Sequence, residues 1–227
     1  MLSRTQISLI VGLTAVLWAA VLLTRGIAFS LDQFLAFGAT VTGLTLLTSW
    51  FNTRCWRFGV FKGWLVQRPW VQGTWRVTLE SSWIDPATNK TVPPISGFMV
   101  FRQTFSSLSA RFYTKESSSE TVTATVLQAP DCVFQVSAAY RNEPTPKLRG
   151  VRSEIHFGAF VFDVHGDPPN SLSGKYWTDR KTNGTMVLED RNDRLITSFE
   201  EGSRLYDPKT DDVADRPADG ERVEASP

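Results

Sequence analysis

The sequence holds 227 residues, which suits one ordinary domain with an appendage. Its composition is unremarkable except for 8 Trp and 15 Phe, and its formal net charge is +1. The two cysteines and two histidines have no CxxC, CxxH or HExxH spacing, which argues against a zinc site and against a disulfide scaffold.

Two apolar runs near the N-terminus predict transmembrane helices. Residues 7–23 and 34–51 contain 17 and 18 consecutive residues without a charge. At about 1.5 Å per residue, each run can cross roughly 30 Å of hydrocarbon if its flanking residues help. The connection TRGIAFSLDQ suits a tight turn, so residues 1–60 are expected to form a two-transmembrane helical hairpin. A cleaved signal peptide is the alternative for the first run, but a second run follows at once and no small-x-small cleavage site is clear.

Basic residues beside the two runs predict their orientation. Four cations follow the second run within the stretch 54–68, Arg4 precedes the first run, and Arg25 in the connection is balanced by Asp32. The positive-inside rule then places both the N-terminus and the C-terminal domain in the cytoplasm. Residues 61–69 are read as a juxtamembrane linker. Cations and aromatic residues interleave over the stretch 54–68, as in a juxtamembrane segment that lies on anionic lipid. Ala39 and Gly43 are spaced for close helix contact, although such residues are common in membrane helices anyway.

From residue 70 to about 205 the apolar pattern changes to a period of two. In the run from Gly73 to Glu80, for example, Trp75, Val77 and Leu79 share one face. The runs cover residues 73–80, 97–106, 109–115, 120–127, 132–141, 155–164, 172–180 and 185–190, with a further short strand expected at 195–199. About eight short strands separated by turns predict an all-β domain, either a sandwich or an antiparallel up-and-down barrel that is lipocalin-like in shape. A barrel of about eight strands can hold one small ligand.

The last residues, 206–227, form an acidic tail. They contain seven acidic and three basic residues, a charge of −4, so the first 205 residues carry +5. The tail has Pro and Ala but no apolar periodicity, and it cannot bury enough surface to offset its ordering entropy. We expect it to be disordered.

Two motifs suggest a family. The first strand reads P-W-V-x-G-x-W from Pro69 to Trp75, and a late strand reads L-x-G-x-Y-W-T-x-R from Leu172 to Arg180. With the two membrane spans before them, they make the chain resemble the two-transmembrane β-barrel effectors of bacterial cyclic-oligonucleotide-based antiphage (CBASS) systems. The resemblance runs from residue 1 to about residue 200.

The resemblance implies a receptor and a killer protein in one chain. A cognate CD-NTase would make a cyclic dinucleotide, which the cytoplasmic barrel would bind. The chain would then form homo-oligomers in the bacterial inner membrane, contact membrane lipid and disrupt the bilayer, so that the infected cell dies in an abortive infection. Such a protein is not an enzyme, needs no cofactor or metal, and does not bind DNA or RNA polymers.

A cyclic dinucleotide requires cations or amides for its phosphates, rings for its bases, and hydroxyls for its edges. The strand 172–180 offers these at a spacing of two, and Leu172 suggests which face points inward. We therefore expect Tyr176, Thr178 and Arg180 to contact the ligand. A register shifted by one residue would bring Trp177 inside instead. The residues of this strand and its Asn-Gly turn are also those of an ordinary β-hairpin without a ligand site.

Three further ligand contacts are predicted, each with a structural alternative. Trp75 either stacks on a base or plugs the barrel. Arg102 and Arg111 interrupt apolar strands, so each either points outward or meets a phosphate inside.

The competing function is a membrane-anchored, lipocalin-like carrier of a small apolar ligand, suggested by the G-x-W motif and the high aromatic content. Catalysis has little support. The available acid pairs, Glu189-Asp190 and Glu200-Glu201, are consecutive residues, which on a strand would point to opposite faces.

Overall fold

The computed structural model describes residues 4–24, 26, 30–63, 65–85, 89–146 and 154–207. Almost all of the predicted disordered tail therefore lies outside the described residues. The chain divides into two compact units. The first comprises residues 1–67 together with the short loop 104–107, and the second comprises the rest. The division at Gln67 falls inside the predicted linker, and each unit is described by itself.

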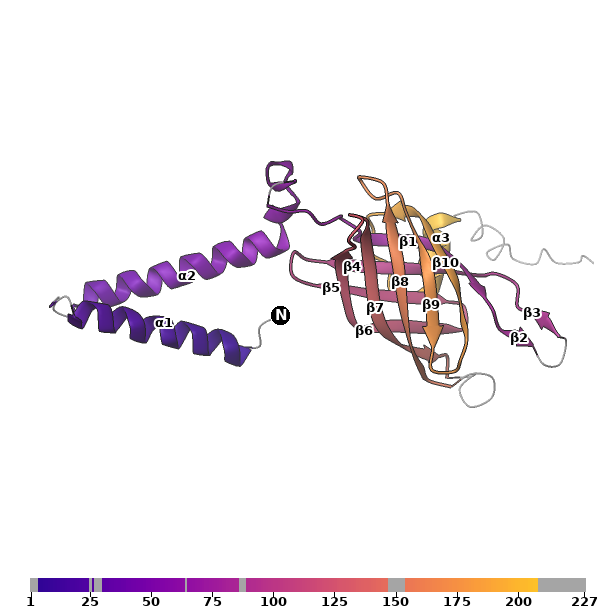
Figure 1. Ribbon diagram of the computed structural model, residues 1–227, viewed down its shortest axis with the longest axis horizontal. Helices are drawn as coiled ribbons and strands as arrows, with labels where there is room; N and C mark the ends of the chain where they lie inside the picture. The colour runs from indigo at the N-terminus through magenta and orange to yellow at the C-terminus, as the bar shows by residue number, and fades with distance from the viewer. Residues whose placement is uncertain are drawn as a thin grey trace, which may run out of the picture. The chain divides into compact units, whose positions relative to one another are not determined.

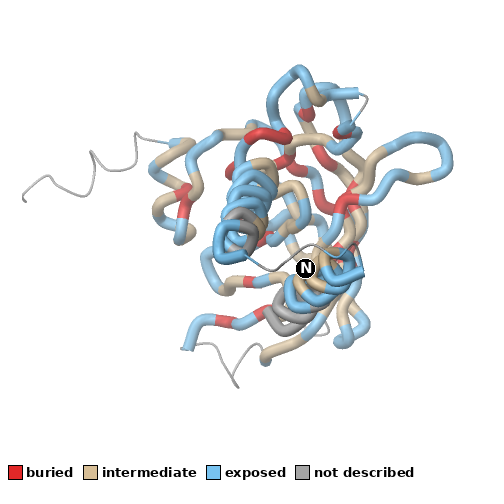
Figure 2. Tube along the Cα trace, turned by 90° about the vertical axis from the view of Figure 1, so that its left-hand side faces the viewer, coloured by how far each residue is buried: buried red, intermediate tan, exposed pale blue. Residues whose placement is uncertain are grey.

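The first unit contains the two predicted helices, α1 (Arg4–Thr24) and α2 (Leu31–Thr53). Trp18 of α1 stacks on Phe37 of α2 with ring centroids 4.7 Å apart. Large apolar side chains of both helices are exposed, and α1 and α2 are mostly pale blue in Figure 2. Within the described ranges, no helix combines the length and the apolar character that crossing a membrane requires. The spans at 7–23 and 34–51 stay a prediction.

The first unit ends in two turns of 3-10 helix, η1 (Cys55–Arg57) and η2 (Gly59–Phe61). The loop Thr104–Ser107 packs in this unit. The backbone N–H of Phe105 donates to the carbonyl of Asn52 at 2.9 Å, and the N–H of Ser106 donates to the Asn52 side chain at 2.9 Å. The Phe105 ring meets Phe51 edge-on with centroids 5.3 Å apart. These contacts cap the end of α2.

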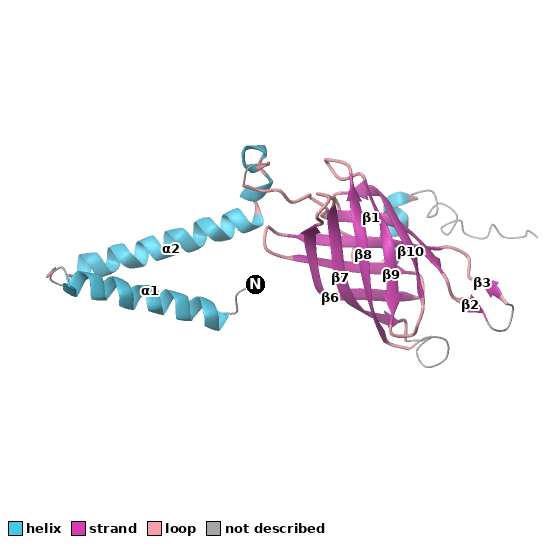
Figure 3. Ribbon diagram, viewed as in Figure 1, coloured by secondary structure: helices cyan, strands magenta, loops and turns pink. Residues whose placement is uncertain are grey.

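The second unit is a closed antiparallel barrel of eight strands, which confirms the barrel predicted from the period of two (Figures 1 and 3). The strands run in the order β1-β10-β9-β8-β7-β6-β5-β4, so each pairs with its neighbour in sequence and the first pairs with the last. Their bounds are β1 Gly73–Ser81, β4 Ile95–Gln103, β5 Leu108–Thr114, β6 Ser117–Gln128, β7 Phe134–Pro144, β8 His156–His165, β9 Ser171–Thr178 and β10 Asn183–Asn192. A separate ribbon of β2 (Ile84–Asp85) and β3 (Lys90–Thr91) lies in the connection between β1 and β4, where the sequence suggested only a turn.

Alternating apolar side chains fill the barrel interior. Trp75, Phe101, Phe162 and Leu172 are fully buried and belong to one continuous core cluster. Burying each such side chain stabilises the fold by about 1.5–3 kcal/mol. A barrel of eight strands is just wide enough to be filled in this way, so most of the interior is a packed core.

A short helix, α3 (Phe199–Tyr206), follows the last strand, so the short strand predicted at 195–199 is wrong. The Ser198 hydroxyl caps the helix by accepting a hydrogen bond from the N–H of Glu201 at 3.2 Å. Phe98 on the outer face of β4 stacks on Tyr206, with centroids 5.4 Å apart. The Tyr206 hydroxyl lies 2.7 Å from the carbonyl oxygens of both Thr74 and Asp190, in contact with β1 and β10.

Candidate functional site

The barrel interior becomes polar at the end where the turn between β9 and β10 lies. We call this region the polar mouth and define it by six inward-facing residues: Ser81, Ser119, Tyr140, Asn142, Tyr176 and Thr178. Strand pairing brings them together, because Ser81 and Tyr176 both flank Gly184, while Tyr140 and Thr178 both flank Gly158. The Ser119 hydroxyl donates to Oδ1 of Asn142 at 2.7 Å.

Two glycines make room for the tyrosine rings of the polar mouth. A Cβ atom at Gly158 would lie 2.5 Å from Cζ and the hydroxyl oxygen of Tyr140. At Gly184 it would lie 2.9 Å from the ring of Tyr176 and 2.0 Å from the carbonyl oxygen of Glu80. Real Cβ atoms do not approach so closely, so a larger residue at either position would displace the ring or the backbone. The strands are therefore built to accept two aromatic side chains at this end.

Both tyrosines remain neutral at ordinary pH. Burial raises the pKa of Tyr140 well above its usual value, and the nearby Tyr176 and Asp179 add to the effect. Burial also raises the pKa of Tyr176, while a hydrogen bond with Ser81 opposes that shift. A neutral phenol both donates and accepts hydrogen bonds. The polar mouth therefore offers hydroxyl groups, an amide and aromatic rings in one place.

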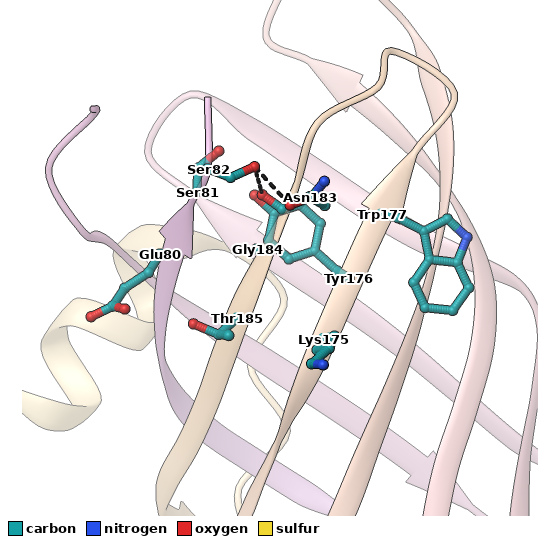
Figure 4. A pocket seen from close by; sticks show the side chains of 9 residues that line it. All are labelled: Glu80, Ser81, Ser82, Lys175, Tyr176, Trp177, Asn183, Gly184 and Thr185. Atoms are coloured by element: carbon teal, nitrogen blue, oxygen red, sulfur yellow. Dashed lines mark hydrogen bonds between the residues drawn. The ribbon is translucent and has the colours of Figure 1, made fainter. Parts of the chain in front are cut away.

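An open hollow of about 520 Å³ lies at this end against β1, β9 and β10. It is lined by Glu80, Ser81, Ser82, Lys175, Tyr176, Trp177, Asn183, Gly184 and Thr185 (Figure 4). The Ser82 hydroxyl bonds to Oδ1 of Asn183 at 2.7 Å and holds the end of β1 against the β9–β10 turn. The lining includes both faces of β9, with Tyr176 from the inner face and Trp177 from the outer.

The predicted register is confirmed for residues 172–178, but β9 ends at Thr178, so the prediction that Arg180 shares the inner face is wrong. Leu172 is fully buried and Tyr176 is 7% exposed, whereas Trp177 is 49% exposed on the outer face. Thr178 shares the inner face, and its hydroxyl lies 2.7 Å from that of Thr182. Arg180 is exposed in the turn that follows β9, at the rim of the polar mouth. Their predicted contacts with a ligand stay a prediction.

The structure corrects the other three predicted contacts. Arg102 is exposed between two buried residues and so points away from the interior. Arg111 also points outward, where its Nη2 lies 2.6 Å from Oε2 of Glu120. Neither arginine can meet a phosphate inside the barrel. Trp75 is 0% exposed and its Nε1–H donates to the Val71 carbonyl at 2.9 Å, so it plugs the barrel and has no free face for a base.

Four residues of the polar mouth were missed from the sequence: Ser81, Ser119, Tyr140 and Asn142. The signal for two of them was available, because Tyr140 and Asn142 continue the inward alternation of Val136 and Ala138 along one strand. Within the described ranges, no three His, Cys, Asp or Glu residues gather in a way that could hold a metal ion.

Comparison with known proteins gives two matches. The family model described as the Cap15 cyclic dinucleotide receptor domain matches residues 66–190. CD-NTase-associated protein 15 of Yersinia aleksiciae is 26% identical to this chain over 185 residues, which cover 80% of this chain and 83% of that protein. The first match spans nearly the whole barrel, and the polar mouth lies inside it.

Proposed function

The chain belongs to the family of Cap15 cyclic dinucleotide receptors, effectors of CBASS antiphage defence, and from this premise we propose that the polar mouth is where its barrel binds the cyclic dinucleotide. The observation that carries the proposal is the change from an apolar to a polar interior at one end of the barrel. A ligand with two phosphates and two bases needs convergent polar groups. The rest of the interior is filled by the apolar core cluster, apart from the buried Gln103, whose side-chain amide bonds to the backbone of Val71 and Pro69.

The groups of the polar mouth match those of the ligand. Tyr140 and Tyr176 supply rings for base contacts and neutral hydroxyls that donate to phosphate or base oxygens. The Asn142 amide is suited to the edge of a base. Arg180 at the rim supplies a cation for phosphate. The hollow of about 520 Å³ falls within the range of ordinary small-molecule sites, roughly 300–1,000 Å³. It meets the polar mouth at Ser81 and Tyr176, while Lys175, Trp177 and Thr185 line it from the outer face.

The test is binding of a panel of cyclic dinucleotides to the full chain, read as thermal stabilisation and by calorimetry. A ligand present at a hundred times its dissociation constant stabilises the folded state by about 2.7 kcal/mol. Arg180→Gln should weaken binding, whereas Arg102→Gln removes an outer-face arginine and should not. Equal losses in both variants would mean that the ligand does not enter the polar mouth.

We further propose that α1 and α2 anchor the chain in the bacterial inner membrane, with the barrel in the cytoplasm. The support is the two uncharged runs, the exposed apolar side chains of both helices and the cations that follow α2. Ligand binding then promotes association of barrels, gathers the helical hairpins, and disrupts the bilayer. Dye release from vesicles that contain the full chain, with and without cyclic dinucleotide, tests this step. Release that is independent of the ligand would contradict it.

The role of the chain is that of a receptor, and we propose that it catalyses no reaction. The alternative of an apolar carrier is weakened, because the barrel interior that would hold an apolar ligand is filled by core side chains, among them Phe101, Phe160 and Phe162. Trp75 of the G-x-W motif is one of them. Lipid co-purifying with the isolated protein, in place of a response to cyclic dinucleotides, would favour the carrier.

A further inference from the structure

The segment that follows α2 folds back on itself. Cys55, Trp56 and Val66 are 4%, 3% and 4% exposed. The N–H groups of Leu65 and Val66 both donate to the Phe61 carbonyl, at 3.2 and 2.9 Å, and the N–H of Gly63 donates to the Val66 carbonyl at 3.1 Å. Residues 54–67, which we call the basic knob, thus form a compact piece of structure in their described part.

The outside of the basic knob is unusually apolar. Phe58 is 51% exposed, Val60 is 71% exposed and Leu65 is 47% exposed. Single exposed apolar residues are ordinary on protein surfaces, but three large ones within eight positions of a folded segment are a patch that marks an interaction site.

The same segment is strongly positive. Arg54, Arg57 and Lys62 are all exposed. The sequence contains no Asp or Glu between Asp32 and Glu80, so this stretch of the chain carries a net positive charge. Cations interleaved with exposed apolar side chains complement a layer that is anionic at its surface and apolar beneath.

We propose that the basic knob docks on the anionic headgroups of the membrane, with Phe58, Val60 and Leu65 inserted among the lipids. Docking fixes the point at which the chain leaves the bilayer, since Arg54 directly follows the last residue of α2. The inference rests on the proposed membrane placement and adds the lipid class that the chain prefers. An acidic protein partner would suit the cations but would give no reason for three inserted apolar side chains.

The experiment uses the full chain with a fluorescent label that reports water exposure. Val60→Cys in a Cys132→Ser background places one accessible thiol on the knob, because the remaining Cys55 is buried. Labelled with NBD, the protein is reconstituted in phosphatidylcholine vesicles with and without phosphatidylglycerol. In the anionic vesicles we expect a blue shift of the emission and quenching by spin-labelled lipid, both reduced by high salt.

Charge variants then test the role of the cations. Arg54→Gln, Arg57→Gln and Lys62→Gln together should shift the docking equilibrium toward water about a hundredfold, from about fivefold per cation. Arg102→Gln, Arg111→Gln and Arg141→Gln remove the same charge from the outer face of the barrel, where Arg102 and Arg111 are exposed and Arg141 is half-buried, and should leave the label unchanged.

Two outcomes would overturn the proposal. Either the label stays in water although the protein is bound to anionic vesicles, or it is equally buried with and without phosphatidylglycerol. If the vesicles do not retain the protein at all, both the basic knob docking and the membrane placement fail. The response of the same sample to cyclic dinucleotide, read as thermal stabilisation, separates these failures from failure of the receptor site.

Discussion

Replacing Tyr176 by Phe tests whether the ligand is bound by the inner or the outer face of β9. The change deletes one hydroxyl from a side chain that is 7% exposed and leaves its ring in place. Loss of the hydrogen bond with Ser81 should lower the free energy of unfolding by about 0.5–1.5 kcal/mol. A hydroxyl that also donates to a charged phosphate is worth about 1.5–3 kcal/mol, so affinity should fall about 10- to 150-fold.

Calorimetry with the cognate cyclic dinucleotide gives the affinity, and urea unfolding of the same protein gives the stability. Trp177→Phe is the matched control, because Trp177 is the next residue along the strand and is 49% exposed on the outer face. Its stability should change by less than about 0.5 kcal/mol, and its affinity should not change. Unchanged affinity in Tyr176→Phe together with a large loss in Trp177→Phe would refute the inner-face site and move binding to the outer wall of the hollow.

Three other predictions follow from the fold. Gly202→Ala should lower the unfolding free energy of the barrel by about 1–3 kcal/mol, because the added Cβ would lie 2.3 Å from the Phe98 ring. Urea unfolding measures the change, and Gly38→Ala is the control, because a Cβ at Gly38 meets nothing within 4 Å. Burial raises the pKa of Tyr206 to about 12 from 10.0, so the folded state holds this proton longer than the unfolded state does. The contribution of Tyr206 to stability should therefore be fully present below pH 10 and be lost between pH 10 and about 12; unfolding at a series of pH values should show a smaller loss over this range in Tyr206→Phe than in the unchanged chain. Arg111→Gln breaks an exposed ion pair and should change stability by less than about 1 kcal/mol and ligand affinity not at all, and a large affinity loss by calorimetry would mean that the outer face takes part in binding.

The number of strands and the register of β9 could be predicted from the sequence because one apolar residue fixes a whole face. Leu172 is fully buried, and with a period of two its position sets the direction of Tyr176 and Trp177. Arg102 and Arg111 obey the same alternation, and the error was to read a cation in an apolar strand as a ligand contact when the outer face already accounts for it.

The polar mouth could not be assembled from the sequence because its residues lie on four strands, β1, β6, β7 and β9. Ser81 and Tyr176 are far apart in sequence and become neighbours only through the pairing of β1 with β10 and of β10 with β9. The helix α3 was not predicted for a different reason. Its eight residues, FEEGSRLY, are too few to show a helical period, and its place is decided by packing on Phe98.

Because the first strand of the barrel pairs with the last, the barrel can close only after β10 has been synthesised. Seven strands are complete once β9 has emerged, but they form an open sheet with β1 and β9 as bare edges until β10 pairs with both. Tyr206 then fastens β1 and β10 from outside through Thr74 and Asp190. Closure thus depends on contacts between residues more than 100 positions apart, which makes folding slow compared with local structure formation. A nascent or truncated chain without β10 lacks Gly184 and so cannot complete the polar mouth, and we expect that it would not respond to cyclic dinucleotide.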